Sequence, residues 1–307
     1  MSVILAIDGG GSRTRCLAVN RAGNTIGEAT SGPSNHLLVD KNTVAQSLAE
    51  AIETCLVTAR LARTDIACLS AGLAGVDYDG TGAAEMKELL AEMGFTEPVI
   101  NGDMVIAHAG ALRASAGVVA LSGTGSCVLG IGSNGKRVKV GGWGPVYGDE
   151  GSAYRIGEMS LRAAARAYDG RGPETALVEA LTSALNVIDF PQTVSRVYVE
   201  AMEPREIAAL SRVAYEVAEA GDEVAREIFL QAGDELAESV SAALRQLDLD
   251  EPLVSYQGAV LDACHLLRQQ FVNRLQQTVK RVHVAPPEFE PVVGAYLLGR
   301  KALGWVN

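Results

Sequence analysis

Two glycine-rich turns in the sequence have the residue types that bind phosphate. Asp8–Thr14 reads DGGGSRT, and Ser122–Ser126 reads SGTGS. Consecutive glycines let backbone N–H groups point at one anion without interference from a Cβ atom. In the first turn Ser12 and Thr14 add hydroxyl donors, and Asp8 can hold Mg²⁺ through water. The first turn matches neither the P-loop, which continues into Gly-Lys-Ser/Thr, nor the dinucleotide-binding turn, which opens a helix.

The two turns occupy equivalent places in a repeated pattern of strand, glycine turn, strand, tight turn and strand. The first copy is expected at 3–7, 14–19 and 25–29, and the second at 117–121, 127–131 and 137–140. Either turn alone could be an ordinary hairpin, but two at matching places favour phosphate binding. A repeat of about 110 residues is too long for a solenoid and indicates a duplicated domain. We therefore expect the turns to face each other across a cleft between two domains.

Hydrophobic periodicity and turn residues predict the remaining elements. Helices are expected at 41–59, 83–93, 104–112, 260–278 and 292–303 and on both sides of Gly221-Asp222, and strands at 66–71, 98–101, 252–256 and 282–285. A mostly helical insertion follows the second copy at 150–205. This pattern predicts an N-terminal domain at 1–113 and a C-terminal domain at 114–307, with the C-terminal helix able to pack back on the first domain.

The composition excludes several classes of function. The 307 residues include 26 Lys and Arg against 37 Asp and Glu, a net charge of −11 that argues against a nucleic-acid or anionic-membrane partner. The five cysteines form no CxxC pair and fit reduced thiols in a cytoplasmic protein. No apolar stretch approaches the ~20 residues of a membrane span, and Asp8 interrupts the N-terminal apolar run too early for a signal peptide.

A 14-residue motif after the second copy of the repeat indicates a more specific family. Gly141–Tyr154 reads GGWGPVYGDEGSAY, which resembles the GGWG…GDEGS block of the N-acetylglucosamine kinase family and of its neighbours, the ATPases that activate benzoyl-CoA and hydroxyacyl-CoA reductases. Four shorter pieces match in the family's order: Ser34–His36, Asn101–Asp103, Ala220–Asp222 and Gly258–Leu261. The resemblance covers essentially the whole chain. It implies an α/β fold of duplicated ribonuclease H-like domains with an interdomain cleft, the actin-like ATPase architecture shared by actin, sugar kinases and heat-shock chaperones.

The resemblance also implies roles for individual residues. Asp103 matches the catalytic base that accepts the proton of a sugar 6-hydroxyl, although an Asp before a helix can also be an N-cap. Trp143 matches a sugar contact but could pack in the core, and Gly221 matches an adenosine contact but could simply end a helix. The implied sugar contacts are Asn35, Asp103, Ser126, Gly142, Trp143, Gly144 and Asp149. The implied ATP contacts are Gly10, Gly11, Ser12, Thr14, Thr124, Gly221, Gly258 and Ala259, with Asp8 on the metal.

These roles describe an ATP- and Mg²⁺-dependent kinase that phosphorylates the 6-hydroxyl of a small-molecule amino sugar, with N-acetylglucosamine as the leading substrate. Glucosamine and N-acetylmuramic acid stay open, because the residues that recognise the acetyl group are expected within 150–205. An ATPase that energises a redox partner would need cysteines placed to bridge subunits, whereas Cys16, Cys55 and Cys127 fall in predicted strands and a helix. A regulator that only senses ATP or sugar would have no use for Asp103. The relatives also suggest a homodimer.

Overall fold

The computed structural model describes residues 2–305, and its internal contacts divide the chain into two compact units. Unit 1 contains the chain up to Gly117, the segment Leu129–Arg137 and the chain from Pro286 onward. Unit 2 contains Val118–Val128 and Val138–Ala285. The predicted domain boundary between residues 113 and 114 stays a prediction.

The first sheet has the strand order β3-β2-β1-β4-β5. Its strands are β1 (Val3–Gly9), β2 (Thr14–Asn20), β3 (Thr25–Ser31), β4 (Ile66–Leu73) and β5 (Val99–Gly102). β1 pairs antiparallel with β2, and β2 pairs antiparallel with β3, which confirms the predicted meander. β1, β4 and β5 run parallel, so their carboxyl ends lie at one edge of the sheet.

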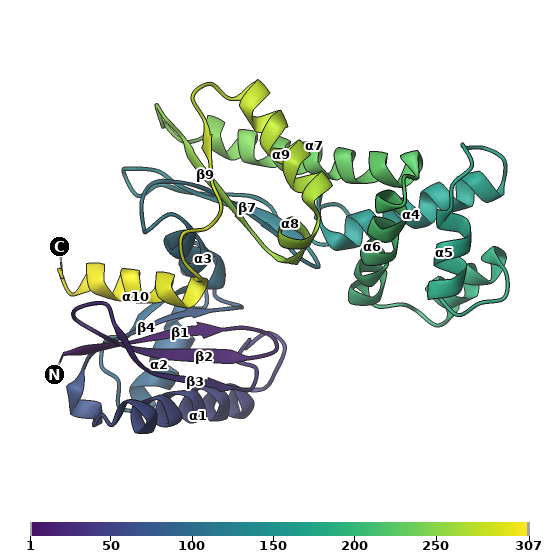
Figure 1. Cartoon of the computed structure of the whole chain (residues 1–307). Coiled ribbons are helices and arrows are strands. Elements are labelled where there is room, and N and C mark those ends of the chain that lie inside the picture. The colour runs from purple at the N-terminus through teal and green to yellow at the C-terminus, as the bar shows by residue number, and fades with distance from the viewer. Residues whose placement is uncertain (1, 306–307) are drawn as a thin grey trace. The chain divides into compact units, whose positions relative to one another are not determined.

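Helices cover both faces of this sheet. They are α1 (Lys41–Ala59), α2 (Ala83–Glu92), α3 (Asp103–Ala111) and α10 (Pro291–Ala302). The odd-numbered apolar residues from Val3 to Ile7 pack in a core with α1 and α2, whereas Ile4 and Ala6 pack in a second core with α10. Figure 1 shows α1 on one side of the sheet and α10 on the other. Because side chains alternate along a strand, an uninterrupted apolar run such as β1 requires cover on both faces.

The C-terminal helix α10 packs closely on α3. A Cβ atom built on Gly294 of α10 would lie 1.9 Å from the backbone oxygen of Ile106 in α3, so only glycine permits this separation of the two helices. The backbone N–H groups of Glu288 and Phe289, just before α10, donate to the carbonyls of Ala111 and Gly110 at the end of α3. The last part of the chain is thereby fixed to the unit in which the chain begins.

The second sheet repeats the order of the first. Its strands are β6 (Gly117–Ser122), β7 (Ser126–Ile131), β8 (Arg137–Gly141), β9 (Leu253–Gln257) and β10 (His283–Val284). Their spatial order is β8-β7-β6-β9-β10, which corresponds strand by strand to β3-β2-β1-β4-β5. β6 pairs parallel with β9, and β9 with β10, as in the first sheet. The predicted duplication is therefore confirmed at the level of topology.

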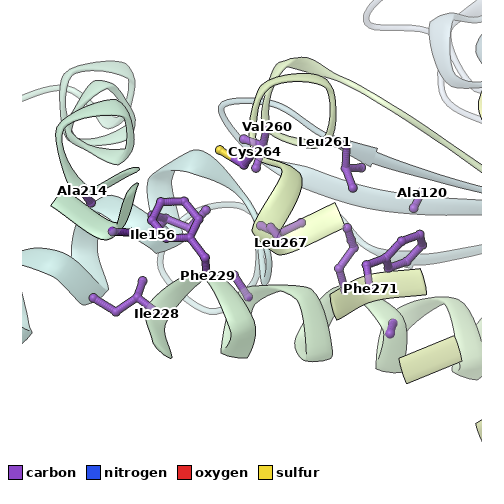
Figure 2. Packing of buried hydrophobic residues seen from close by; sticks show 14 of the residues in the cluster. Ala120, Ile156, Ala214, Ile228, Phe229, Val260, Leu261, Cys264, Leu267 and Phe271 are labelled. Atoms are coloured by element: carbon purple, nitrogen blue, oxygen red, sulfur yellow. The ribbon is translucent and has the colours of Figure 1, made fainter. Parts of the chain in front are cut away.

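Unit 2 also contains a helical layer. Its α-helices are α4 (Ala153–Tyr168), α5 (Leu177–Ala184), α6 (Pro204–Glu219), α7 (Glu223–Arg245), α8 (Ala259–Ala263) and α9 (His265–Thr278). A π-helix, Ser195–Val199, and a 3₁₀ turn, Phe190–Gln192, lie between α5 and α6. The core of this unit is built around the fully buried rings of Phe229 in α7 and Phe271 in α9 (Figure 2).

One predicted helix is wrong in its continuity. The sequence favours a single helix over 260–278, but the chain breaks at Cys264, which has extended dihedral angles, to give α8 and α9. The guanidinium of Arg268 donates to the carbonyls of Leu261 and Asp262, which the break leaves without helical partners. Periodicity could not show this break, because the apolar spacing continues through it.

Across residues 2–305, every helix is either too short or too polar to span a bilayer.

Candidate active site

Two carboxylates of unit 1 lie at the carboxyl ends of β1 and β5, the two parallel strands on either side of β4. Asp8 near the end of β1 pairs with Gly72 of β4, and Gly72 pairs with Asn101 of β5. Asp103 follows β5 directly and is the first residue of α3. In open α/β sheets ligands bind outside the carboxyl ends of the parallel strands, so this edge is the expected place for a site.

The charges at this edge act on one another. Burial raises the pKa of Asp8, and the negative charge of Asp103 raises it further. The guanidinium groups of Arg13 and Arg15 oppose this rise in pKa. Two carboxylates close enough to influence each other's protonation make a place where a cation is favoured.

Sequence reasoning assigned no role to Arg15. It lies directly across the β1–β2 hairpin from Asp8, and its Nε donates to Glu28 Oε1 at 2.7 Å. Its Nη1 also donates to Glu290, the residue that precedes α10. The register of the hairpin could have suggested that residue 15 faces residue 8. Nothing in the sequence pattern could have indicated Glu290.

Asp103 is not the N-cap of α3, which was the alternative to its role as catalytic base. Gly102 is the N-cap of α3, and Asp103 is the first helical residue. The Asp103 Oδ1 atom accepts a hydrogen bond of 2.8 Å from the backbone N–H of Met104. The side chain is half-buried. This bond to the helix terminus fixes the carboxylate at the edge where Asp8 lies.

Hydrogen bonds hold the first glycine turn in shape. The N–H of Gly10 donates to the carbonyl of Arg13, and the N–H of Ser34 donates to the carbonyl of Gly10. The hydroxyl of Thr14 is fully buried, 2.8 Å from Gly32 O and 2.7 Å from Ser34 Oγ, so it organises the turn. Gly11 and Ser12, in the middle of the turn, are exposed to solvent.

The segment after Ser34 lies beside this turn. Asn35 is half-buried, and its Oδ1 accepts a hydrogen bond of 3.0 Å from the N–H of Leu37. The ring of His36 lies against Gly75, in the loop after β4. Its Nδ1 is buried without a hydrogen-bond partner in the part of the chain that the structure describes. The sequence analysis assigned no role to His36. Its position next to Asn35, an expected sugar contact, was the one indication that it lies near the site.

In unit 2 the second glycine turn is bonded to the start of α4. The N–H of Ala153 donates to the carbonyl of Gly123 at 2.9 Å, and the N–H of Tyr154 donates to the carbonyl of Thr124 at 3.1 Å. The hydroxyl of Ser126 donates to the carbonyl of Glu150 at 2.7 Å. The structure therefore brings the SGTGS turn together with the second half of the GGWG…GDEGS block. Thr124 itself is exposed.

Asp149 is the buried acid of this region. It is 7% exposed, adopts a left-handed φ of 59°, and its Oδ1 accepts a 3.3 Å hydrogen bond from the N–H of Ser126. Burial raises its pKa, and the N–H of Ser126 partly counters that rise. Its carboxylate lies against Gly125, where an added Cβ would be 2.8 Å from Oδ2.

The first half of the same block is exposed. Trp143 is 67% accessible to solvent, which excludes core packing for this side chain. Its Cβ lies over Gly148, and its neighbours Gly142 and Gly144 both have positive φ. Such an exposed indole is available to pack on the apolar face of a ligand.

The predicted adenosine contacts lie at two other turns of unit 2. Gly221 follows α6 with a φ of +97° and has open space around its Cβ position. Gly258, at the turn between β9 and α8, has a φ of +112°, and a Cβ there would lie 2.2 Å from Ser122 O. Ala259 begins α8 and is exposed. Both glycines thus have a conformational reason for being glycine, whatever binds beside them.

Comparison with known proteins gives the family. The chain matches the sequence profile of the BadF/BadG/BcrA/BcrD ATPase family over residues 5–299. It belongs to this family. This BadF-family ATPase is 29% identical to the N-acetylmuramic acid/N-acetylglucosamine kinase of Clostridium acetobutylicum, with 98% of this chain and 99% of the relative covered. It is 28% identical to the N-acetyl-D-glucosamine kinase of Dictyostelium discoideum, with 96% and 97% covered.

Solved structures agree on the fold of this BadF-family ATPase. A provisionally assigned N-acetylglucosamine kinase of Chromobacterium violaceum superposes with a TM-score of 0.75 at 23% identity, covering 96% of this chain and 98% of the other. A ROK family glucokinase from Streptomyces griseus superposes with a TM-score of 0.55 at 18% identity, covering 97% and 99%. The expected α/β fold of duplicated ribonuclease H-like domains is therefore confirmed. Membership of an ATPase family identifies ATP as a substrate.

Within residues 2–305, the cysteines of this ATPase belong to no group of three or more potential metal ligands. Cys16, Cys55 and Cys264 are buried, and Cys68 and Cys127 are half-buried. The three buried side chains are enclosed in the core of the chain itself, so they could not hold a group shared with a second subunit.

Proposed function

We propose that this ATPase is an amino-sugar kinase that transfers the γ-phosphoryl group of ATP to the 6-hydroxyl of N-acetylglucosamine. The observation that carries the proposal is Asp103, a fixed, half-buried carboxylate beside Asp8 at the carboxyl edge of the first sheet. Similarity to curated amino-sugar kinases along nearly the whole chain supports it. Glucosamine and N-acetylmuramic acid are the alternative acceptors, since relatives with these names match as well.

In the proposed reaction Asp103 is the general base. The sugar oxygen attacks the γ-phosphorus while its proton passes to the Asp103 carboxylate. The bond from the γ-phosphorus to the bridging oxygen breaks, and ADP leaves with the electron pair. The hydrogen bond from Met104 N–H holds Asp103 in place, so little reorganisation is needed when the hydroxyl arrives.

We propose that Asp8 holds Mg²⁺ through water. The donors fit, because burial and Asp103 raise the pKa of Asp8, and a cation would relieve this unfavourable charge. Residues 2–305 present no cluster of three or more His, Cys, Asp or Glu ligands, which suits an ion that keeps several waters and binds substrate phosphates. When bound, the ion supplies neutralisation of phosphate charge.

The remaining assignments are part of the same proposal. Sugar contacts are Asn35, Asp103, Ser126, Gly142, Trp143, Gly144 and Asp149, and ATP contacts are Gly10, Gly11, Ser12, Thr14, Thr124, Gly221, Gly258 and Ala259. Thr14 would act through the shape of the turn, because its own hydroxyl is buried. The thiol form of the five cysteines fits action in the reducing cytoplasm, and we propose a homodimer as the working assembly.

The test is a panel of acceptors with ATP and Mg²⁺, followed by release of ADP. The panel contains N-acetylglucosamine, glucosamine, N-acetylmuramic acid and glucose, with a sugar-free reaction as background. We expect N-acetylglucosamine to give the highest kcat/KM and a product phosphorylated at O6. If no amino sugar raises ADP release above the background, the kinase proposal is wrong.

A further inference from the structure

A basic cavity lies in unit 1 beside the last turns of α10. It has a volume of about 360 Å³, and its wall includes Leu17, Val19, Arg113, Phe289, Tyr296 and Arg300. A second cavity of about 370 Å³ shares Arg113, Leu297 and Arg300 with the first and adds Lys301 and Trp305. We call these two adjoining cavities the α10 pocket. Each has the volume of a small-ligand site.

The charge of the α10 pocket is opposite to that of the chain. Arg113, Arg300 and Lys301 line it, and the described lining residues include neither Asp nor Glu. The whole chain carries a net charge of −11, so this is a local concentration of positive charge. The ion pair of Arg113 with Glu288, at 3.5 Å and with both side chains at least half exposed, neutralises little of it.

Aromatic rings hold the guanidinium groups of the α10 pocket. The Arg113 guanidinium lies 5.8 Å from the ring centre of Phe289, and that of Arg300 lies 5.7 Å from the ring centre of Tyr296. These contacts are within the range of cation–π attraction and restrict where the groups point. Arg113 also adopts a left-handed φ of 53°, followed by Ala114 at 57°, a backbone conformation that ordinary residues rarely adopt.

The remaining wall of the α10 pocket is apolar. Leu17 and Val19 of β2 form it together with Val293 and Leu297 of α10. A ligand that fits both parts must therefore combine an anionic group with an apolar ring. Three cations match a dianionic phosphate better than a carboxylate, whose single charge one guanidinium can satisfy.

We propose that the α10 pocket is a second ligand site, which binds a small phosphate monoester whose ring packs on the apolar wall. The α10 pocket differs from the proposed catalytic edge in its position along the sheet: Asp8 pairs with Arg15 of β2, whereas Leu17 and Val19 of the pocket wall pair with Ala6 and Ile4, further from the end of β1. It goes beyond the proposed kinase activity, and its test requires no turnover.

The test measures binding of phenyl phosphate to the full chain by titration calorimetry. Arg113→Gln and Lys301→Gln, both at exposed positions, should each weaken binding roughly tenfold, the effect of one lost charge-assisted hydrogen bond. Arg205→Gln is the matched control, because Arg205 is an exposed arginine of unit 2 that pairs only with a neighbouring Glu203 in the described residues. It should bind as the unsubstituted chain does.

Two further probes test the ligand class and the place of binding. Benzoate, which has the ring but one charge, and inorganic phosphate, which lacks the ring, should both bind at least tenfold more weakly than phenyl phosphate. In a Trp143→Phe chain only Trp305 remains, and its fluorescence should change saturably with phenyl phosphate. The proposal is overturned if phenyl phosphate does not bind, if all three arginine and lysine variants bind it equally, or if benzoate or inorganic phosphate matches its affinity.

Discussion

Replacing Asp103 with Asn separates catalysis from folding. Asn has nearly the shape of Asp, and its Oδ1 can still accept the hydrogen bond from Met104 N–H that now holds Asp103. What it loses is the ability to take a proton. Removal of a general base costs about 10²–10⁴-fold in rate, which corresponds to about 3–5 kcal/mol in the activation barrier. We expect kcat to fall by that factor while ATP binding is retained.

The cost in stability should be much smaller. A carboxylate in the first turn of a helix contributes about 0.3–1 kcal/mol through the helix dipole. Loss of the Asp103 charge also relieves Asp8, whose pKa that charge raises, and this gain offsets part of the cost. The net change should stay below about 1 kcal/mol, which shifts Tm by at most about 3 °C.

The assay compares ADP release, calorimetric ATP binding and thermal unfolding for Asp103→Asn and for a matched control. Asp40→Asn is the control, because Asp40 is the N-cap of α1 in the same unit and accepts bonds from the N–H groups of Asn42 and Thr43. It should leave kcat unchanged. A folded Asp103→Asn chain with a kcat within threefold of the original would refute the general-base role and leave Asp103 as a helix-terminal residue only.

Three further predictions test other parts of the structure. Gly258→Ala should lower the free energy of unfolding by about 2–4 kcal/mol, because the new Cβ would lie 2.2 Å from Ser122 O at a φ of +112°. Gly135→Ala is the control: its φ is also positive but the space around it is open, so it should lower the free energy of unfolding by only about 1–2 kcal/mol. Thermal unfolding measures both changes. Trp143→Ala should change the free energy of unfolding by less than about 0.5 kcal/mol, because the side chain is 67% exposed. It should raise KM for the amino sugar about tenfold, with a smaller effect on kcat, and an unchanged KM would argue against stacking of the sugar on this ring. Burial lowers the pKa of His108 to about 4 in the folded chain, compared with 6.5 in the unfolded chain. The unfolded chain therefore binds the proton more readily. The free energy of unfolding should fall by up to about 3 kcal/mol as the pH drops from about 6.5 to 4. Denaturant unfolding of His108→Gln should lack this part of the pH dependence, and an equal slope in both chains contradicts the assignment.

Several elements were predictable because their signals are local. The stripe Val44, Leu48, Ile52 and Cys55 predicted α1 over the same residues that the structure gives, and all four side chains are buried. The two glycine turns predicted the two meanders, and the common strand order of the sheets confirms the repeat. The break at Cys264 was missed, because the apolar period continues through it and a side chain four residues later satisfies the freed carbonyls.

By itself the sequence determined the class of fold and the repeat, because periodicity and turn chemistry act within a few turns of chain. The family and the proposed base Asp103 were suggested by the resemblance of the GGWG…GDEGS block and of Asn101–Asp103 to known motifs. Only the tertiary structure decided which distant side chains meet. Arg15 and Glu290 are 275 positions apart, and the cations of the α10 pocket come from the end of α3 and from the last helix. Such meetings depend on how α10 packs against β1 and α3, where Gly294 sets the closest approach. A local pattern contains no information about that packing, so these parts of the protein became visible only in three dimensions.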